Sequence, residues 1–520
     1  MFKKIIVSLF LVGLLASPSF ASTQVISSGT STAWVSGQYV PIMAAGSVGP
    51  TATAALSQEP IPSSGTFSKL YCKVATAPGS GKSVTLTVEI AGSGTALACT
   101  ISDTNTTGSD LTHTASVTAG QVGDIAITSS GSSPTTAVVS WSLLFDGTTT
   151  NESIIAATHD TALSATNTRY AGPAAITVVS TTESPNEEVL ISTGGTIKNL
   201  YVILSTALTS GNYVFTVTKN TTAQSVTCTV TSSTCSDTSN SFAVVAGDRI
   251  SIKAVGNSAS ASPTFSVGLT FVSTTNGEFL LPFRIKGATL STTNTEYFNM
   301  CSSPQTTENI RYSLAQAMTV KNIYALLGTA PGTAASGKQR DFTLRTNGTT
   351  NTAETVNLFE TATTNSTTTN VTINNGDILS VKSVPTSTPA ASTLTIGMTG
   401  YIAPTSTIDH LAVTGISDPI FRGRTSDVTV TAQDASNATV TTYTGTVTFT
   451  SNDSSATLPS NYQFVGGDNG VHTFTAGVKM GTVGEKTVTA TDTVTGSITG
   501  TQSAITVLPA PQVIIMRGDS

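Results

Sequence analysis

Three aspartates near the C-terminus are the residues whose types best suit a metal site. Asp453, Asp468 and Asp492 fall within about 40 residues of one another, and clustered carboxylate oxygens are the ligands that calcium prefers. Aspartates in short loops also bond the backbone of their own turns. The stretch therefore predicts turn residues first and a calcium site second, and we expect no other cofactor.

Residues that could carry acid–base or nucleophilic chemistry are sparse. A zinc site or a nucleophile–base pair needs side chains that converge, and the histidines are scattered without HxxxH or HxH spacing. No G-x-S-x-G sequence occurs, and acids are too few in the first three quarters of the chain to favour the carboxylate pair of a glycosidase. The four histidines are His113, His159, His410 and His472.

The segment from Ala77 to Ser83 imitates the end of a phosphate-binding loop. That motif needs a glycine where this chain has Thr76, and it must open a helix that receives the phosphate. A strand pattern follows instead, so we predict a hairpin turn. With no catalytic constellation in the sequence, we expect a protein that is not an enzyme.

Aromatic side chains could serve as platforms for sugar rings. The candidates are Trp34, Trp141 and three tyrosines that recur along the chain, Tyr71, Tyr201 and Tyr324. Each of these tyrosines stands inside a short apolar strand pattern, where packing in a core is the usual role of an aromatic ring. We therefore expect core packing rather than sugar binding.

Five cysteines in an exported chain are expected to pair. Cys228 and Cys235 are spaced to bridge a short hairpin, which contributes about 2 to 3 kcal/mol in the chain-entropy model. Cys72 and Cys99 are the second pair that we propose. Cys301 is then left free or bonded to another molecule, although spacing alone leaves other pairings open.

These residues lie in three copies of one pattern, with a period of about 125 residues. This period is too long for a solenoid repeat of roughly 20 to 50 residues, so each copy is predicted to be a domain. Each copy carries a first tyrosine, a second tyrosine within an apolar strand, and a Gly-Asp pair. The landmarks are Tyr39, Tyr170 and Tyr297; Tyr71, Tyr201 and Tyr324; and Gly123-Asp124, Gly247-Asp248 and Gly376-Asp377.

Within each copy apolar and polar residues alternate, as Phe215 and Val217 do with their threonine neighbours. This period of two predicts strands with one buried face, and dipeptides such as Asn347-Gly348 predict hairpin turns. The fold class expected is all-β, as tandem β-sandwiches. About eight strands per copy favour a jelly roll over a seven-stranded Ig module. The predicted repeats span 22–148, 149–275 and 276–405.

A fourth unit, at 406–508, has different motifs. They are VTVTAQD at 428–434, YTGTVTFTSND at 443–453, LPSNYQF at 458–464, DNGVHTF at 468–474 and KTVTATDT at 486–493. In their order and spacing, over about 408–507, they resemble the bacterial Ig-like repeats of invasin-type surface proteins. The resemblance implies an Ig-type sandwich that acts as a spacer or presentation module and carries no catalytic residue. The first three copies resemble, more weakly, jelly-roll-like modules of extracellular bacterial and phage proteins.

The two ends of the chain carry short signals. Residues 1–21 combine Lys3 and Lys4 with an apolar run at 5–15 and a small-x-small site, which predicts a secretory signal peptide cleaved between Ala21 and Ser22. The apolar run is shorter than the roughly 20 residues that span a bilayer. Residues 509–520 read as a linker or truncated tail and end in RGDS, which chance alone can produce.

Amino-acid composition limits the classes of binding partner that we expect. Charged residues make up only 10% of the chain, and 23 basic against 29 acidic residues give a net charge of −6 without a basic cluster. Nucleic-acid binding needs such a cluster, so we expect none, and no membrane span after signal removal. A secreted or cell-surface protein with a structural or adhesive role is the first hypothesis. The alternative is a carbohydrate-binding protein or an accessory part of a polysaccharide-degrading system. The ligand, a surface glycan or a protein receptor, is not identified by the sequence, and self-assembly stays open.

Overall fold

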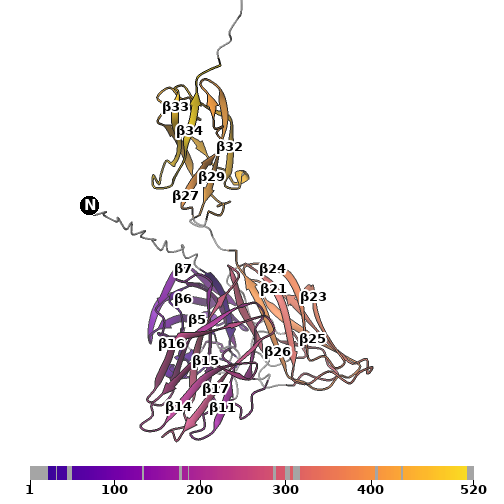
Figure 1. Ribbon diagram of the computed structural model, residues 1–520. Coiled ribbons are helices and arrows are strands. Elements are labelled where there is room, and N and C mark those ends of the chain that lie inside the picture. Colours follow the sequence, from indigo (N-terminus) through magenta and orange to yellow (C-terminus); the bar gives the residue numbers. More distant parts are fainter. Residues whose placement is uncertain are drawn as a thin grey trace, which may run out of the picture. The chain divides into compact units, whose positions relative to one another are not determined.

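The computed structural model describes residues 22–30, 32–43, 50–131, 134–174, 179–184, 187–284, 289–298, 305–308, 317–348, 350–403, 408–434 and 437–511. Its contacts divide the chain into two compact units, Phe20–Pro404 and Thr405–Ser520. Nearly all regular structure in the described ranges is β-strand (Figure 1).

The first repeat is an eight-stranded jelly roll with one additional short strand, β3. One sheet has the strand order β1-β9-β4-β7 and the other β2-β8-β5-β6, with β3 pairing β8. Two antiparallel four-stranded sheets with this alternation of strands are the jelly-roll arrangement. The strands are β1 (Ser22–Gly29), β2 (Gln38–Val40), β3 (Glu59–Pro60), β4 (Gly65–Val74), β5 (Gly79–Ile90), β6 (Ser93–Asp103), β7 (Thr107–Val117), β8 (Val122–Ser130) and β9 (Val139–Gly147).

The second and third repeats have the same topology. Their sheets follow the orders β10-β18-β13-β16 and β11-β17-β14-β15, then β19-β26-β21-β24 and β20-β25-β22-β23. The jelly roll is therefore present three times. The strands of the second repeat are β10 (Glu152–His159), β11 (Thr168–Ala171), β12 (Val189–Leu190), β13 (Gly195–Leu204), β14 (Asn212–Lys219), β15 (Thr222–Val230), β16 (Thr234–Val244), β17 (Arg249–Asn257) and β18 (Phe265–Ser273). Those of the third are β19 (Glu278–Arg284), β20 (Glu296–Phe298), β21 (Met318–Leu327), β22 (Gln339–Thr346), β23 (Thr350–Phe359), β24 (Thr364–Ile373), β25 (Leu379–Thr386) and β26 (Leu394–Tyr401).

Strand register shows that one sequence landmark was placed wrongly. Gly123-Asp124 lies inside β8, whereas the residue that matches the turn glycines of the other copies is Gly120, which has a φ of +89°. The side chain of Gln121 accepts a hydrogen bond from the backbone N–H of Thr118, as the aspartates of the later copies do from the residue three positions earlier. In the first copy Gln121 therefore stands where the later copies have an aspartate, so this turn does not carry the Gly-Asp pair that marks the others.

The three jelly rolls close into a ring. Val25, Ile154 and Leu280 occupy equivalent positions in the first strand of each repeat. Ile154 of the second repeat belongs to the buried cluster of the first, Leu280 of the third to that of the second, and Val25 of the first to that of the third. Because each sandwich inserts an apolar side chain into its neighbour in the same rotational sense, the arrangement has approximate threefold symmetry.

Neighbouring residues of these strands face opposite ways. Ile26 and Ile155, directly after Val25 and Ile154, pack in the cores of their own sandwiches. Successive side chains of a strand point to opposite faces, so consecutive apolar residues are buried on both sides. All eight residues of β10 are buried, which explains an apolar run that one-sided burial would not produce.

Hydrogen bonds join the repeats beside these apolar contacts. The Gln24 side chain donates to the carbonyl of Ile154 at 2.9 Å and accepts from its N–H at 2.8 Å. Between the second and third repeats the Thr193 hydroxyl donates to the Glu278 carboxylate at 2.6 Å, and the Thr399 hydroxyl donates to that of Ser192 at 2.9 Å. These buried side chains are therefore paired across the interfaces, as buried polar groups require.

The second unit has Ig-type topology. A three-stranded sheet of order β27-β29-β32 faces a sheet of order β28-β34-β33-β30-β31, in which β28 pairs with β34 in parallel. Val428, Val430 and Val447 are fully buried, and Phe449 is 9% exposed, so all four point inward as the alternation predicts. The strands are β27 (His410–Thr414), β28 (Ile420–Phe421), β29 (Thr425–Gln433), β30 (Thr446–Ser451), β31 (Tyr462–Gln463), β32 (Val471–Lys479), β33 (Gly484–Asp492) and β34 (Thr499–Leu508).

Candidate functional site

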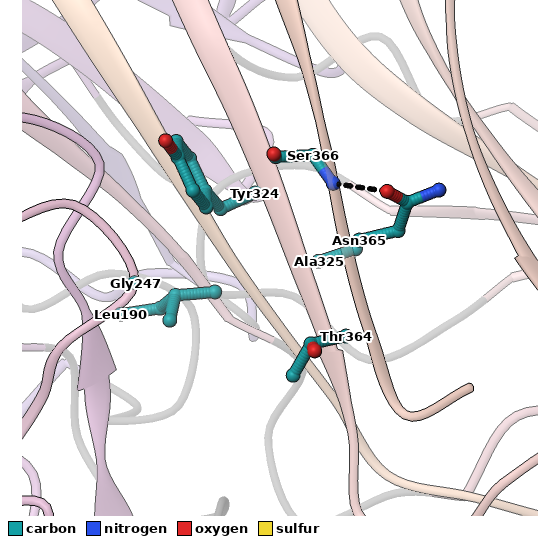
Figure 2. A pocket seen from close by; sticks show the side chains of 7 residues that line it. All are labelled: Leu190, Gly247, Tyr324, Ala325, Thr364, Asn365 and Ser366. Carbon is teal, nitrogen blue, oxygen red and sulfur yellow. Dashed lines mark hydrogen bonds between the residues drawn. The ribbon is translucent and has the colours of Figure 1, made fainter.

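Two pockets lie at the interfaces between repeats. The first has a volume of about 430 Å³ and is lined by Pro60 and Gly120 of the first repeat together with β13 and β16 of the second, including Tyr201. The second has a volume of about 340 Å³ and is lined by Leu190 and Gly247 of the second repeat together with β21 and β24 of the third, including Tyr324 (Figure 2).

The two pockets are built from equivalent residues. Strand register matches Pro60 with Leu190, because Pro60 pairs with Val122 and Leu190 pairs with Arg249, which is the residue equivalent to Val122. Tyr201 pairs with Ser236 just as Tyr324 pairs with Ser366. The remaining lining residues also correspond: Val202 with Ala325, Thr234 with Thr364, and Cys235 with Asn365. Ile203 corresponds to Leu326, which does not line the second pocket. The ring thus repeats one pocket at two successive interfaces.

Local backbone structure sets the walls of both pockets. Asn199 and Asn322, each at a register shift before the tyrosine, have φ of +54° and +48°. Such a bulge bends its strand and increases the local twist, and here it lies two residues before the tyrosine that lines each pocket. On the opposite wall Gly120 and Gly247 have φ of +89° and +92°, a conformation that favours glycine.

The recurring tyrosines do not pack in the cores of their own sandwiches, contrary to the sequence expectation. In β13 the neighbours Leu200 and Val202 are buried in the core, so Tyr201 points to the outer face and is half-buried there. Tyr71 packs against the buried cluster of the third repeat. Only alternate residues of the apolar strand are buried in its own sandwich. The tyrosine lies between them on the other face, where its aromatic ring contacts the neighbouring repeat.

The two tryptophans are core residues. Trp34 and Trp141 are each 1% exposed and belong to the buried cluster of the first repeat. The indole N–H of Trp141 donates to the carbonyl of Ile42 at 3.0 Å. Neither side chain can offer its face to a sugar ring in this structure.

Both proposed disulfides are present, with Cα–Cα distances of 6.2 Å for Cys72–Cys99 and 5.8 Å for Cys228–Cys235. Cys99 and Cys228 occupy equivalent positions on β6 and β15 but bond to different strands. Gly108 stands where the second repeat has Cys235, and a Cβ there would lie 3.2 Å from the Cys99 sulfur. The missing side chain leaves room for Cys72 to reach across, so the first copy is stapled as well as the middle one.

The middle disulfide borders one pocket and an asparagine the other. Cys235 lines the pocket beside Tyr201, whereas Asn365 lines the one beside Tyr324. Asn365 donates to the carbonyl of Asn357 at 2.7 Å. It also accepts from the Ser366 N–H at 2.9 Å (Figure 2). A covalent bond and a pair of hydrogen bonds therefore hold the same edge of the two pockets.

The pocket linings contain no carboxylate, ammonium, guanidinium or imidazole group. Charged residues close in sequence to the linings are in ion pairs. Lys198–Glu152 at 2.6 Å and Lys321–Glu278 at 3.3 Å lie near the tyrosines, and Arg249–Glu188 at 3.2 Å and Lys219–Asp248 at 3.8 Å lie near Leu190 and Gly247. What each pocket offers is one tyrosine ring, hydroxyl groups and backbone amides. This set of groups is suited to neutral polar ligands.

The three aspartates named as calcium candidates serve separate local networks. Asp453 accepts from the N–H groups of Gly481 and Thr482 at 2.8 and 3.0 Å. Within the described ranges no group of three or more His, Cys, Asp or Glu side chains is placed to hold a metal ion. Asp468 bonds groups of nearby residues, Val465, Tyr462 and His472. Asp492 bonds Val494 and Thr495, which follow it closely in the sequence, and the more distant Tyr443.

The histidines do not converge either. His159 is fully buried and stacks on Phe265 with ring centroids 4.4 Å apart. The other three each pair with a carboxylate near in sequence: His113 with Asp110, His410 with Asp409, and His472 with Asp468. The Gly79–Ser83 segment opens strand β5 rather than a helix, so it does not form a phosphate-binding loop.

The first repeat contains a buried acid at the position that the sequence pattern assigned to a Gly-Asp landmark. Asp124 is fully buried on β8, opposite Glu89 of β5, and one carboxylate oxygen accepts a hydrogen bond from Ser57 at 3.0 Å. Burial raises the pKa of Asp124 to about 7, the Ser57 bond opposes that rise, and the Glu89 charge adds to it. In the third repeat the equivalent pair is Arg345 and Ser380, which both bond Glu308.

Several sequence predictions concern residues outside the described ranges. These are the signal at 1–21 with its cleavage site after Ala21, the state of Cys301, and most of the tail at 509–520 with its RGDS. In the part of the chain that the structure does describe, no helix combines the length and the apolar character that a membrane crossing requires.

No protein-family model matches the chain, and no curated protein matches it.

Proposed function

We propose that the protein is exported and acts outside the cell as a non-catalytic adhesive or structural protein. In this proposal the ring of three jelly rolls does the binding, and the Ig-type unit, which resembles invasin-type repeats, is a spacer or presentation module. The observation that carries it is the ring itself, which repeats one pocket of neutral groups at two interfaces. A rigid scaffold that presents repeated sites suits adhesion to a repetitive surface, because linked sites raise the effective concentration for each other.

Export is supported by the residue pattern at 1–21 and by the two disulfides, because disulfides persist in oxidising compartments. Expression of the full chain in a bacterial host, followed by N-terminal sequencing of the exported material, tests this part. We expect a mature chain that begins at Ser22. Retention in the cytoplasm with an intact N-terminus would contradict the proposal.

Adhesion is tested by applying the labelled full chain to bacterial cells, animal cells and polysaccharide-coated surfaces. Saturable binding to at least one surface is the expected result, and electron microscopy of the same sample reports fibres if the role is structural. Absence of both saturable binding and assembly would contradict the proposal. Glycan hydrolysis abolished by a single carboxylate substitution would show an enzyme instead.

A carbohydrate-binding protein, or an accessory part of a polysaccharide-degrading system, is the second candidate. The observation that favours it is the half-buried tyrosine in each pocket, because an aromatic face with adjacent hydroxyl groups suits a sugar ring. Selective retention of the full chain by one polysaccharide, without adhesion to cells, would favour this candidate.

A further inference from the structure

We propose that the two inter-repeat pockets bind neutral saccharides, with Tyr201 and Tyr324 as the platforms for a sugar ring. This inference rests on the proposed function, since it assigns a ligand class to the adhesive ring. It differs from the sequence expectation, which placed the tyrosines in the cores and left the ligand open.

The geometry of each tyrosine places a ring beside hydroxyl groups. Tyr201 lies directly opposite Ser236 on the outer face of the sheet, and Tyr324 lies opposite Ser366. Directly opposite residues of paired strands have Cβ atoms about 5 Å apart, so their side chains interact. Thr234 is two residues from Ser236 and therefore shares its face. Each pocket thus combines one apolar ring face with a short row of hydroxyls, which matches the alternating C–H and O–H surfaces of a pyranose.

Charge narrows the ligand to neutral sugars. Recognition of phosphate, sulfate or carboxylate groups relies on Arg or Lys donors, and neither lining contains one. A basic ligand would need carboxylates, which are absent from both linings as well. Sialylated or sulfated glycans would therefore leave their charges without partners in these pockets.

The pockets are preformed and suitably small. Volumes of about 340 and 430 Å³ lie at the low end of the range of roughly 300 to 1,000 Å³ seen for small-molecule sites. Their walls belong to different repeats, which are held in close contact: a Cβ on Gly268 would lie 2.2 Å from the Pro60 carbonyl oxygen, and one on Gly397 would lie 2.3 Å from that of Leu190. A rigid site loses little entropy when it binds a short saccharide.

The test uses the full chain and three neutral probes, maltotriose, cellotriose and triacetylchitotriose, beside a glycan array that also carries sialylated and sulfated glycans. Titration calorimetry with the neutral probe that binds best gives the affinity and the number of sites. We expect Tyr201→Ala and Tyr324→Ala each to lower the number of sites by one. Tyr201→Phe, which keeps the ring, should change the affinity by less than about threefold.

Two further variants keep the result interpretable. Tyr170→Ala changes a half-buried tyrosine on β11, outside both pockets, and should bind as the unchanged chain does. Ser366→Arg fills the second pocket without removing a ring and should also abolish one site. It replaces Tyr324→Ala as the test of this pocket if that variant fails to fold. Binding to charged glycans alone, no binding of any neutral saccharide, or site numbers unchanged by the alanine variants would overturn the inference.

The adhesion assay, run with the same variants, separates this inference from the function on which it rests. If the unchanged chain adheres and the double tyrosine variant adheres equally, the pockets are not the saccharide sites, while the adhesive role stands. If the unchanged chain does not adhere to any surface, the adhesive role itself fails.

Discussion

Replacement of Gly268 by alanine should force the first two repeats apart. This glycine lies on β18, and a Cβ there would stand 2.2 Å from the carbonyl oxygen of Pro60 in the neighbouring repeat. Contacts under 3.0 Å are essentially never seen for real Cβ atoms, so the interface must open by about 1 Å. Overpacking of this kind costs about 1 to 3 kcal/mol.

The control for this prediction is Gly94→Ala on β6. A Cβ at Gly94 meets its nearest neighbour, the Thr87 methyl group, at an ordinary 3.6 Å. Glycine-to-alanine changes without strain stabilise by about 0.4 to 1 kcal/mol through the unfolded chain. The two variants are therefore expected to change the free energy of unfolding in opposite directions.

Tryptophan fluorescence during urea unfolding is the assay for both variants. The chain has two tryptophans, Trp34 and Trp141, and both lie in the core of the first repeat, whose Pro60 takes the clash. We expect a lower urea midpoint for Gly268→Ala than for Gly94→Ala. Equal midpoints would refute the close contact between the repeats. Gly397→Ala, which clashes with Leu190 at the next interface, should behave in the same way.

The remaining predictions concern covalent and electrostatic stabilisation of the first repeat. Joint replacement of Cys72 and Cys99 by alanine should lower the free energy of unfolding by about 3.5 kcal/mol, since the bond closes a loop with a sequence separation of 27; an unchanged urea midpoint would contradict this. Because burial raises the pKa of Asp124 to about 7, stability from this group should be complete below pH 4 and should fall as pH rises to 7, by at most about 4 kcal/mol. Asp124→Asn should remove that dependence, and a slope that survives the substitution would assign it elsewhere. Asp110 should have the opposite pH dependence. Burial tends to raise its pKa, but hydrogen bonds from backbone N–H groups outweigh burial and hold the pKa at about 2. Its contribution to stability is therefore present above pH 4 and is lost as the pH falls toward 2, so Asp110→Asn should flatten the acid side of a plot of urea midpoint against pH.

Fold class was predictable because it depends on local patterns. The alternation around Phe215 and Val217, with turn dipeptides such as Asn347-Gly348, identified strands whose apolar face is buried. About eight strands in each copy sufficed to favour the jelly roll. The disulfides followed from cysteine spacing, although the spacing did not reveal that Gly108 redirects the first bond to Cys72.

The candidate site was not predictable because it depends on contacts between repeats. An apolar strand such as the one around Tyr201 is compatible with burial in the same sandwich or against the next one, and only the assembled ring decides between them. A signal was nevertheless present: consecutive apolar pairs such as Ile154-Ile155 indicate strands buried on both faces. One-sided sandwiches do not need such pairs, so they could have pointed to the interfaces.

Closure of the three jelly rolls into one ring is the central claim, and differential scanning calorimetry of the full chain tests it most directly. Unfolding enthalpy is about 0.7 kcal/mol per residue near 60 °C. Residues 22–404 should therefore unfold in one transition of about 270 kcal/mol whose van't Hoff and calorimetric enthalpies agree, separate from a transition of about 70 kcal/mol for the Ig-type unit. Three independent transitions of about 90 kcal/mol, one for each repeat, would contradict the ring.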